Sequence, residues 1–129
     1  MRLNSSQKGQ IAQLKCQLEA NLRGYICSLP TTPQNFDVLL TKNQETIRTQ
    51  IKYCNCLERK NKKRLRLKLG GSTFNRKYYT KNNFDMLLVY VPSVDKILAY
   101  HASSFHKRAT ILINLKDKRS INYFEKYIW

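Results

Sequence analysis

The chain has 129 residues and a formal net charge of +16, from 24 basic and 8 acidic side chains. We expect a chain of this length to form one domain, residues 1–129, that buries about two-thirds of its unfolded surface. The basic excess argues against a metabolic enzyme and favours a polyanion as partner, above all a nucleic acid. No apolar run is long enough to span a bilayer, so the sequence predicts no membrane association.

The first predicted element is a helix over residues 6–23. Ser5 or Ser6 can cap its start, and Gly24 follows it, where a glycine often ends a helix. Apolar side chains at helical spacing form one stripe along the helix, and we expect this stripe to face a sheet. The stripe consists of Ile11, Leu14, Leu18 and Leu22.

A β-hairpin is predicted next, after a short strand at residues 25–29. Its first strand covers residues 36–41 and its second covers residues 46–56, because both stretches are rich in apolar and β-branched residues. The polar break between them is centred on Asn43 and Gln44. This hairpin is the stretch around which the rest of the chain is organised.

The turn sets the register of the hairpin, so that Asp37 falls opposite Gln50 and Lys52 lies one same-face step further along. Directly opposed side chains are roughly 4.5–5.5 Å apart at Cβ. One carboxylate, one amide oxygen and one ammonium therefore converge on a patch that a hydrated metal ion can occupy. The alternative is that Asp37 and Lys52 form a surface ion pair, which contributes little to stability.

Residues 57–71 are strongly basic, and within them cationic and leucine residues alternate. This alternation predicts a strand with one apolar and one cationic face. We interpret the cationic face as a phosphate-binding ridge rather than as an ordinary solvated surface. The cationic positions are Arg64, Arg66 and Lys68, and the apolar positions are Leu65, Leu67 and Leu69.

Aromatic and basic side chains are interleaved over residues 73–80, which include Arg76, Lys77 and Tyr78. Such a pattern suits nucleic acid, because cations meet phosphates and tyrosine stacks or donates a hydrogen bond. It also suits an ordinary strand with core and edge positions. Arg48, on the same hairpin face as the predicted site, is assigned to DNA binding as well.

The rest of the chain is predicted to form short elements, of which the last docks on the body or on a partner subunit. They are a very apolar strand at 83–91, a turn at 92–95, strands at 96–100 and 110–115, a helical turn within 101–109, and a terminal element at 121–129.

Asp85 is a rival for the catalytic acid, because its surroundings echo those of Asp37. The strand that follows Asp85 lacks a polar-x-lysine pattern, so we prefer Asp37. Cys54 and Cys56 are too closely spaced for a zinc knuckle. His101 and His106 can carry protons, although histidines beside a basic loop are more often surface or hydrogen-bonded groups.

Several short motifs follow one another in a recognisable order. They are Lys8-Gly9-Gln10-Ile11-Ala12-Gln13, Gly24-Tyr25, Pro30, Phe36-Asp37 and Gln50-x-Lys52. In order and spacing they resemble the PD-(D/E)XK nuclease superfamily, and in particular the small intron-encoded homing endonucleases of bacteria. The similarity continues through residues 84–100 and covers roughly residues 8–114.

The resemblance implies an α+β fold of the restriction-endonuclease type. Its mixed sheet would have a central hairpin flanked by an N-terminal helix and short C-terminal elements. The implied activity is site-specific hydrolysis of double-stranded DNA with Mg²⁺, for which Mn²⁺ can substitute. Because a double-strand cut needs two sites, we expect a homodimer or homotetramer. The implied location is the bacterial cytoplasm or an organelle of bacterial origin, where the four cysteines stay reduced.

The resemblance also implies residue roles. Asp37 binds the metal, Gln50 occupies the position of a second acid, the carbonyl of Ile51 is a further ligand, and Lys52 orients or activates the attacking water. A helix glutamate that completes many such sites falls on Gln13. With glutamine at two acidic positions, the site should bind metal weakly until DNA phosphate adds negative charge.

Four questions stay open from the sequence. Gln10 is a second candidate for the helix position, and the glutamine there marks either a divergent member or a change that blocks cleavage. A junction resolvase or repair nuclease fits the same motifs. A non-catalytic basic nucleic-acid-binding protein, similar to a ribosomal protein, explains the charge without the hairpin.

Overall fold

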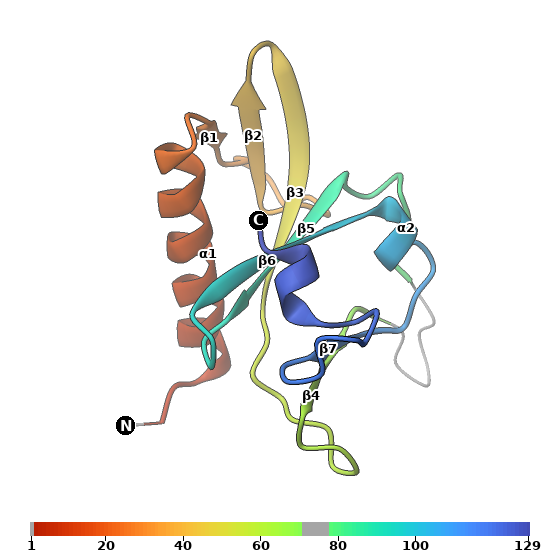
Figure 1. Ribbon diagram of the computed structural model, residues 1–129. Helices are drawn as coiled ribbons and strands as arrows, with labels where there is room; N and C mark the ends of the chain where they lie inside the picture. Colours follow the sequence, from red (N-terminus) through yellow and green to blue (C-terminus); the bar gives the residue numbers. More distant parts are fainter. Residues whose placement is uncertain (1, 71–77) are drawn as a thin grey trace.

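The structure, a computed structural model, describes residues 2–70 and 78–129 (Figure 1). In chain order, its helices and strands are α1 (Ser5–Leu22), β1 (Ile26–Ser28), β2 (Val38–Lys42), β3 (Glu45–Tyr53), β4 (Arg64–Lys68), β5 (Met86–Val91), β6 (Lys96–His101), α2 (Ala102–Phe105), β7 (Thr110–Asn114) and the 3₁₀ helix η1 (Phe124–Tyr127).

The fold is α+β and has three layers. The middle layer is a five-stranded mixed sheet in the order β1-β2-β3-β5-β6, in which only the β3–β5 pair is parallel. Helix α1 lies along one face, and the two-stranded sheet β4-β7 lies on the other side with α2 and η1 (Figure 1). The predicted mixed sheet with a central hairpin is confirmed. No helix in residues 2–70 and 78–129 is long and apolar enough to cross a bilayer.

Helix α1 begins with a capping box. The side chain of Asn4 accepts a hydrogen bond from the Gln7 N–H, and the Gln7 side chain accepts one from the Asn4 N–H, both at 2.9 Å. The cap is therefore Asn4 and not Ser5 or Ser6. The prediction for the other end is confirmed, because Gly24 has φ +85° and its N–H reaches the Asn21 carbonyl.

The prediction that the apolar stripe of α1 faces the sheet is wrong for its three leucines, whereas Ile11 is half-buried and packs against the core. Leu14, Leu18 and Leu22 are 57%, 59% and 74% exposed. The helix packs through small side chains because the sheet already presents bulky ones, and close packing then requires a short spacer. The buried helix positions are Ala12, Cys16 and Ala20. The sheet side chains they meet include Val38, Leu40, Ile51, Met86 and Leu88.

The hairpin β2–β3 has the predicted turn and register. Val38 pairs with Thr49, and Lys42 pairs with Glu45 at the tip. The two loop residues, Asn43 and Gln44, have φ angles of 52° and 68°. Positive φ at both positions gives the turn that matches the right-handed twist of paired strands.

Strand β5 is buried at all six positions because both faces of the sheet are covered at this strand. Leu88 and its same-face neighbours contact the layer of α1, and Leu87 and its neighbours contact the layer of β4 and β7. The predicted alternation of β4 is also confirmed, since Leu65 and Leu67 are buried while Arg66 and Lys68 are exposed.

The C-terminal segment docks on the body, as predicted. The Trp129 N–H donates to the Ile97 carbonyl at 2.9 Å, and Ile128 forms an isolated bridge with Leu98. The aromatic and basic segment at residues 73–80 lies largely outside the described residues.

Candidate active site

Asp37 lies immediately before β2, at the point where the hairpin ladder ends. Its N–H still donates to the Thr49 carbonyl at 2.9 Å. Its carboxylate Oδ2 accepts the Ile51 N–H at 2.8 Å. In a continuing hairpin, a backbone carbonyl of the neighbouring strand would accept the Ile51 N–H. Here the Asp37 side chain accepts it, and the chain before Asp37 diverges from β3. The carboxylate is fixed, half-buried, where the two strands part.

One oxygen of Asp37 is left for another partner. Among the described residues, Ile51 is the hydrogen-bond donor found for this carboxylate. The alternative of an Asp37–Lys52 surface ion pair is not seen in residues 2–70 and 78–129, where the ion pairs involve other residues. The Lys52 ammonium is therefore not neutralised by Asp37.

Gln50 and Lys52 lie on β3 with half-buried side chains. Their neighbours Thr49 and Ile51 are buried, so Gln50 and Lys52 share the opposite face of the sheet. The register places Gln50 next to Asp37, one step beyond the last hairpin pair. The Lys52 ammonium lies 5.4 Å from the centre of the Tyr79 ring, within range of a cation–π contact.

A hollow of about 330 Å³ connects Lys52 with the cationic face of β4. Lys52 and Asn55 line one side, and Arg66 and Lys68 line the other. Three cations from two layers thus border one cavity. Such an arrangement favours an anionic ligand, since each cation lowers the electrostatic energy of a negative charge placed among them.

The helix contributes Gln13, which is half-buried, whereas Gln10 is exposed. Gln13 lies one turn before Cys16 on the side of α1 that turns toward the sheet. Burial raises the pKa of the Cys16 thiol to about 12, and the nearby Asp37 carboxylate adds to the rise. The position favours Gln13 over Gln10 for the helix role, which stays a prediction.

Asp85, the rival acid, is held by Arg48. The guanidinium donates to both carboxylate oxygens at 3.0 and 3.2 Å, and the Arg48 N–H donates to Oδ2 at 2.9 Å. The hydrogen bond from Arg48 lowers the pKa of Asp85, and the same contact raises the pKa of Arg48. This pair joins β3 to the start of β5. The DNA-binding role predicted for Arg48 requires the guanidinium to share or leave Asp85.

One acid in the basic segment was not foreseen as a partner of the ridge. Glu58 accepts from Arg64 at 2.7 Å and from Arg66 at 3.2 Å. The sequence does not predict the pairing of Glu58 with Arg64 and Arg66, because it depends on how the loop before β4 folds back on that strand. Glu58 reduces the effective charge of the ridge, and Lys68 is the ridge cation that forms no ion pair with Glu58. Of the aromatic and basic cluster, Tyr78 is 38% exposed.

Arg76 and Lys77 lie outside the described residues. The remaining titratable candidates have ordinary roles or none visible. His106 Nδ1 accepts the Lys81 N–H at 3.1 Å, so this histidine holds a loop in place. His101 is exposed, and all four cysteines are free thiols.

The oxygen donors at the fork, the place beside Asp37 where β2 and β3 part, fit a hard divalent cation. A carboxylate oxygen, an amide oxygen and backbone carbonyls are ligands that Mg²⁺ accepts while it keeps several waters. In the part of the chain that the structure describes, no group of three or more His, Cys, Asp or Glu gathers. Asp37 is thus the principal anion at the site.

We expect the ridge to bind DNA through phosphates. Replacing Arg64, Arg66 and Lys68 together by glutamine should weaken binding to specific and random DNA alike. Each lost phosphate contact should reduce the log–log salt slope by about 0.9. The measurement is a fluorescence-anisotropy titration at several salt concentrations.

The matched control removes three exposed lysines that lie outside β4, Lys42, Lys118 and Lys126, and should change the affinity less. Glu58→Gln should instead raise the affinity, because it frees two arginines. A loss confined to one DNA sequence would mean that the ridge reads bases rather than phosphates.

Comparison with known proteins supports the fold. A family model of PD-(D/E)XK endonucleases matches residues 3–129. Among solved structures, the chain is similar to a bacterial homing endonuclease, I-Ssp6803I, with a TM-score of 0.79 and 20% sequence identity over 98% of this chain and 89% of that one. This likeness confirms the predicted fold. No curated protein matches the sequence. Because the family model spans almost the whole chain, the protein belongs to the PD-(D/E)XK endonuclease family.

Proposed function

We propose that this protein is a site-specific DNA endonuclease of the homing type, which cuts both strands of a double-stranded target with a divalent metal ion. One observation carries the proposal. On a nuclease fold, the Asp37 carboxylate is fixed by the Ile51 N–H at the fork of β2 and β3, beside Gln50 and Lys52.

The metal we propose is Mg²⁺, with Mn²⁺ as a substitute. The free oxygen of Asp37, the amide oxygen of Gln50 and the carbonyl of Ile51 would hold it, and Gln13 would approach from the helix. The ion, when bound, lowers the pKa of a water and neutralises charge on the phosphate. With one carboxylate in the set, metal and DNA should bind cooperatively, because each supplies charge that the other needs.

The protein's own groups position the DNA and stabilise the charge that develops. Arg66 and Lys68, across the hollow from Lys52, would hold backbone phosphates and so orient the scissile one. The Lys52 ammonium, which Asp37 does not neutralise, would stabilise the negative charge that grows on the phosphate oxygens. Asp37 keeps its orientation throughout, because a backbone donor holds it.

One such site cuts one strand, so a double-strand break requires two. We therefore propose a homodimer or homotetramer that places two sites across a pseudo-palindromic target. A long target also needs more contact area than one chain of this size offers. The setting we propose is the bacterial cytoplasm or an organelle of bacterial origin.

A plasmid cleavage assay tests the proposal. Supercoiled plasmids that carry a randomised target library should become nicked and linear with Mg²⁺ or Mn²⁺. With Ca²⁺ the protein should bind without cutting, because Ca²⁺ is larger and less strict in geometry. Gln13→Glu tests whether a missing acid limits activity. Tight binding with no cleavage in any metal, by the native protein and by Gln13→Glu, would indicate the non-catalytic binder instead.

A further inference from the structure

The outward leucines of α1 form a continuous surface. We call Leu14, Leu18 and Leu22 the leucine ridge; they occupy successive turns, and each is more than half exposed. Single exposed leucines are ordinary on protein surfaces, whereas a row on one helix resembles the packing face of a helix pair. Helix α1 thus has two packing faces, of which the sheet covers one.

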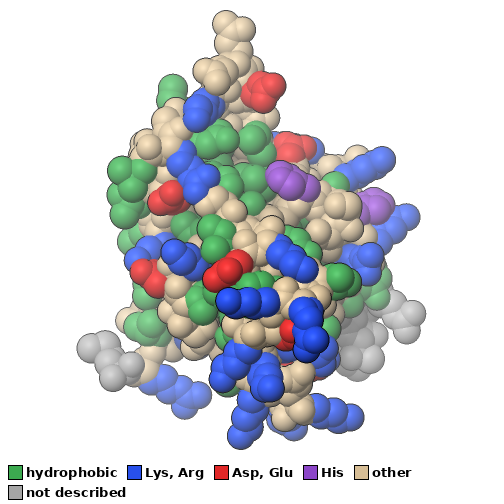
Figure 2. All heavy atoms as spheres, viewed as in Figure 1, with side chains coloured by type: hydrophobic (Ala, Val, Ile, Leu, Met, Phe, Trp, Pro, Cys, Tyr) green, Lys and Arg blue, Asp and Glu red, His purple; other side chains and the backbone are tan. Residues whose placement is uncertain are grey.

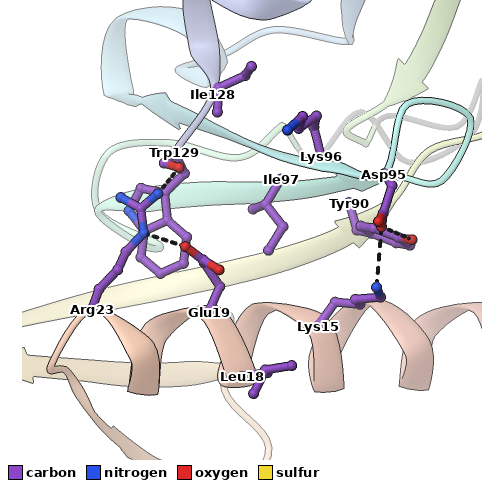
Figure 3. A pocket seen from close by; sticks show the side chains of 10 residues that line it. All are labelled: Lys15, Leu18, Glu19, Arg23, Tyr90, Asp95, Lys96, Ile97, Ile128 and Trp129. Carbon is purple, nitrogen blue, oxygen red and sulfur yellow. Dashed lines mark hydrogen bonds and ion pairs between the residues drawn. The ribbon is translucent and has the colours of Figure 1, made fainter.

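One flank of the leucine ridge is uncharged, in a chain that is otherwise densely charged. The exposed residues on that flank are Gln7, Gln10 and Asn21. The other flank is charged. Lys15, Glu19 and Arg23 turn toward the β5–β6 hairpin, as Figure 3 shows, whereas the Lys8 ammonium lies 6.0 Å from the centre of the Tyr53 ring on β3.

A hollow of about 320 Å³ lies beside the ridge, between α1 and the β5–β6 hairpin (Figure 3). Leu18 belongs to both the ridge and the lining of this hollow. Tyr90, Ile97 and Trp129 add apolar surface to it, and Ile128 is a further exposed apolar side chain at the lining. Ridge and hollow are therefore adjacent parts of one patch.

The charges around this hollow nearly cancel. Lys15 pairs with Asp95 at 3.2 Å, and Arg23 pairs with Glu19 at 2.9 Å. Lys96 is the remaining charged residue of the lining. The whole chain, by contrast, has three bases for each acid. Two copies at +16 each repel one another over most of their surface, and this patch is a face on which that repulsion is weak.

We propose that the leucine ridge and the adjacent hollow form a two-fold interface between two copies of this chain. A two-fold axis places the same patch on both sides, so that the ridge of each copy can pack against the ridge and hollow of the other. A stable interface needs about 800 Å² per partner. An 18-residue helix about 27 Å long and 10 Å wide offers only about 270 Å². The hollow and the hairpin therefore belong to the interface.

The proposed interface leaves the DNA-binding elements free. Helix α1 covers one face of the central sheet, whereas β4 and the Lys52 hollow belong to the opposite side (Figure 1). In Figure 2, lysines and arginines gather at the lower end of the molecule, near β4. The inference rests on the proposed function for the need of two sites, but the surface itself is argued from packing and charge.

Sedimentation velocity of the full chain without DNA tests the interface. The native protein should sediment with at least twice the mass of one chain. Leu18→Glu should shift it to the monomer, with a dimer dissociation constant raised at least 100-fold, because two carboxylates would be buried near the two-fold axis. Leu57→Glu is the matched control, since Leu57 is also half exposed but lies before β4. It should leave the mass unchanged.

A second variant keeps the test decisive. In a Cys56→Ser background, which removes the exposed native thiol, Leu18→Cys should give a disulfide-linked dimer on mild oxidation. Circular dichroism checks that each variant is folded. A native monomer at every concentration, or a dimer that Leu18→Glu leaves intact, would overturn the proposal. Because no DNA or metal is present, failure of the nuclease assay does not affect this result.

Discussion

Asp37→Asn should abolish DNA cleavage while leaving the fold and the DNA affinity almost unchanged. The amide keeps the shape of the carboxylate, and its oxygen can still accept the Ile51 N–H. It removes the principal anion of the metal site. Loss of groups that merely support metal ligands typically costs 10- to 100-fold, so loss of this ligand should cost more than about 100-fold in cleavage rate. Affinity should hold, because the net charge rises only from +16 to +17.

Single-turnover cleavage, thermal unfolding and DNA binding in Ca²⁺ measure the three quantities separately. Asp117→Asn is the control, because Asp117 is exposed in the loop after β7 and should leave all three unchanged. Gln50→Glu adds a second anion and should tighten metal binding on DNA. Unchanged metal affinity in both Asp37→Asn and Gln50→Glu would place the active site elsewhere on the fold.

Local signals made much of the hairpin predictable. Two polar residues, of which Asn43 is a type that tolerates positive φ, stand between two β-rich runs, and the alternation of β3 then fixes which side chains share a face. The neighbourhood of Asp37, Gln50 and Lys52 followed from that register. The hydrogen bond from Ile51 to the Asp37 carboxylate did not, because it depends on where the two strands part.

The orientation of α1 shows what periodicity leaves undecided. The helix carries a row of leucines and, two residues out of phase, a row of small side chains, and both recur every four residues. Hydrophobicity alone assigns the leucines to the core. The bulk of the facing strands reverses that choice, because Met86 and Leu88 leave room only for Ala12, Cys16 and Ala20. Such a choice depends on both partners of a packed pair.

The roles of the charged residues depended most on tertiary structure. Arg48 and Asp85 are 37 residues apart in the chain but meet where β3 pairs with β5. Glu58 reaches Arg64 and Arg66 through the fold of one loop. The excess of basic residues predicts a nucleic-acid partner. Which arginines are free to bind phosphate depends instead on these ion pairs, which only the fold reveals.

Lys52→Ala should stop cleavage by a different route from Asp37→Asn. The ammonium touches the aromatic face of Tyr79 and is not neutralised by Asp37, so it is available to the reacting phosphate. Removing one such electrostatic group typically lowers kcat by 10²- to 10³-fold. Metal affinity on DNA should stay normal, since Lys52 is no ligand. DNA affinity should fall only by the contribution of one phosphate contact.

The comparison with Lys68→Ala separates chemistry from binding, because both lysines line the same hollow. Lys68→Ala should weaken DNA binding and leave the single-turnover rate at saturating protein near normal, whereas Lys52→Ala should lower that rate. Lys52→Arg should restore little, because the guanidinium is planar and bulkier than the ammonium. If Lys52→Ala and Lys68→Ala change rate and affinity alike, Lys52 belongs to the phosphate-binding surface, and another group must stabilise the charge that develops at the phosphate.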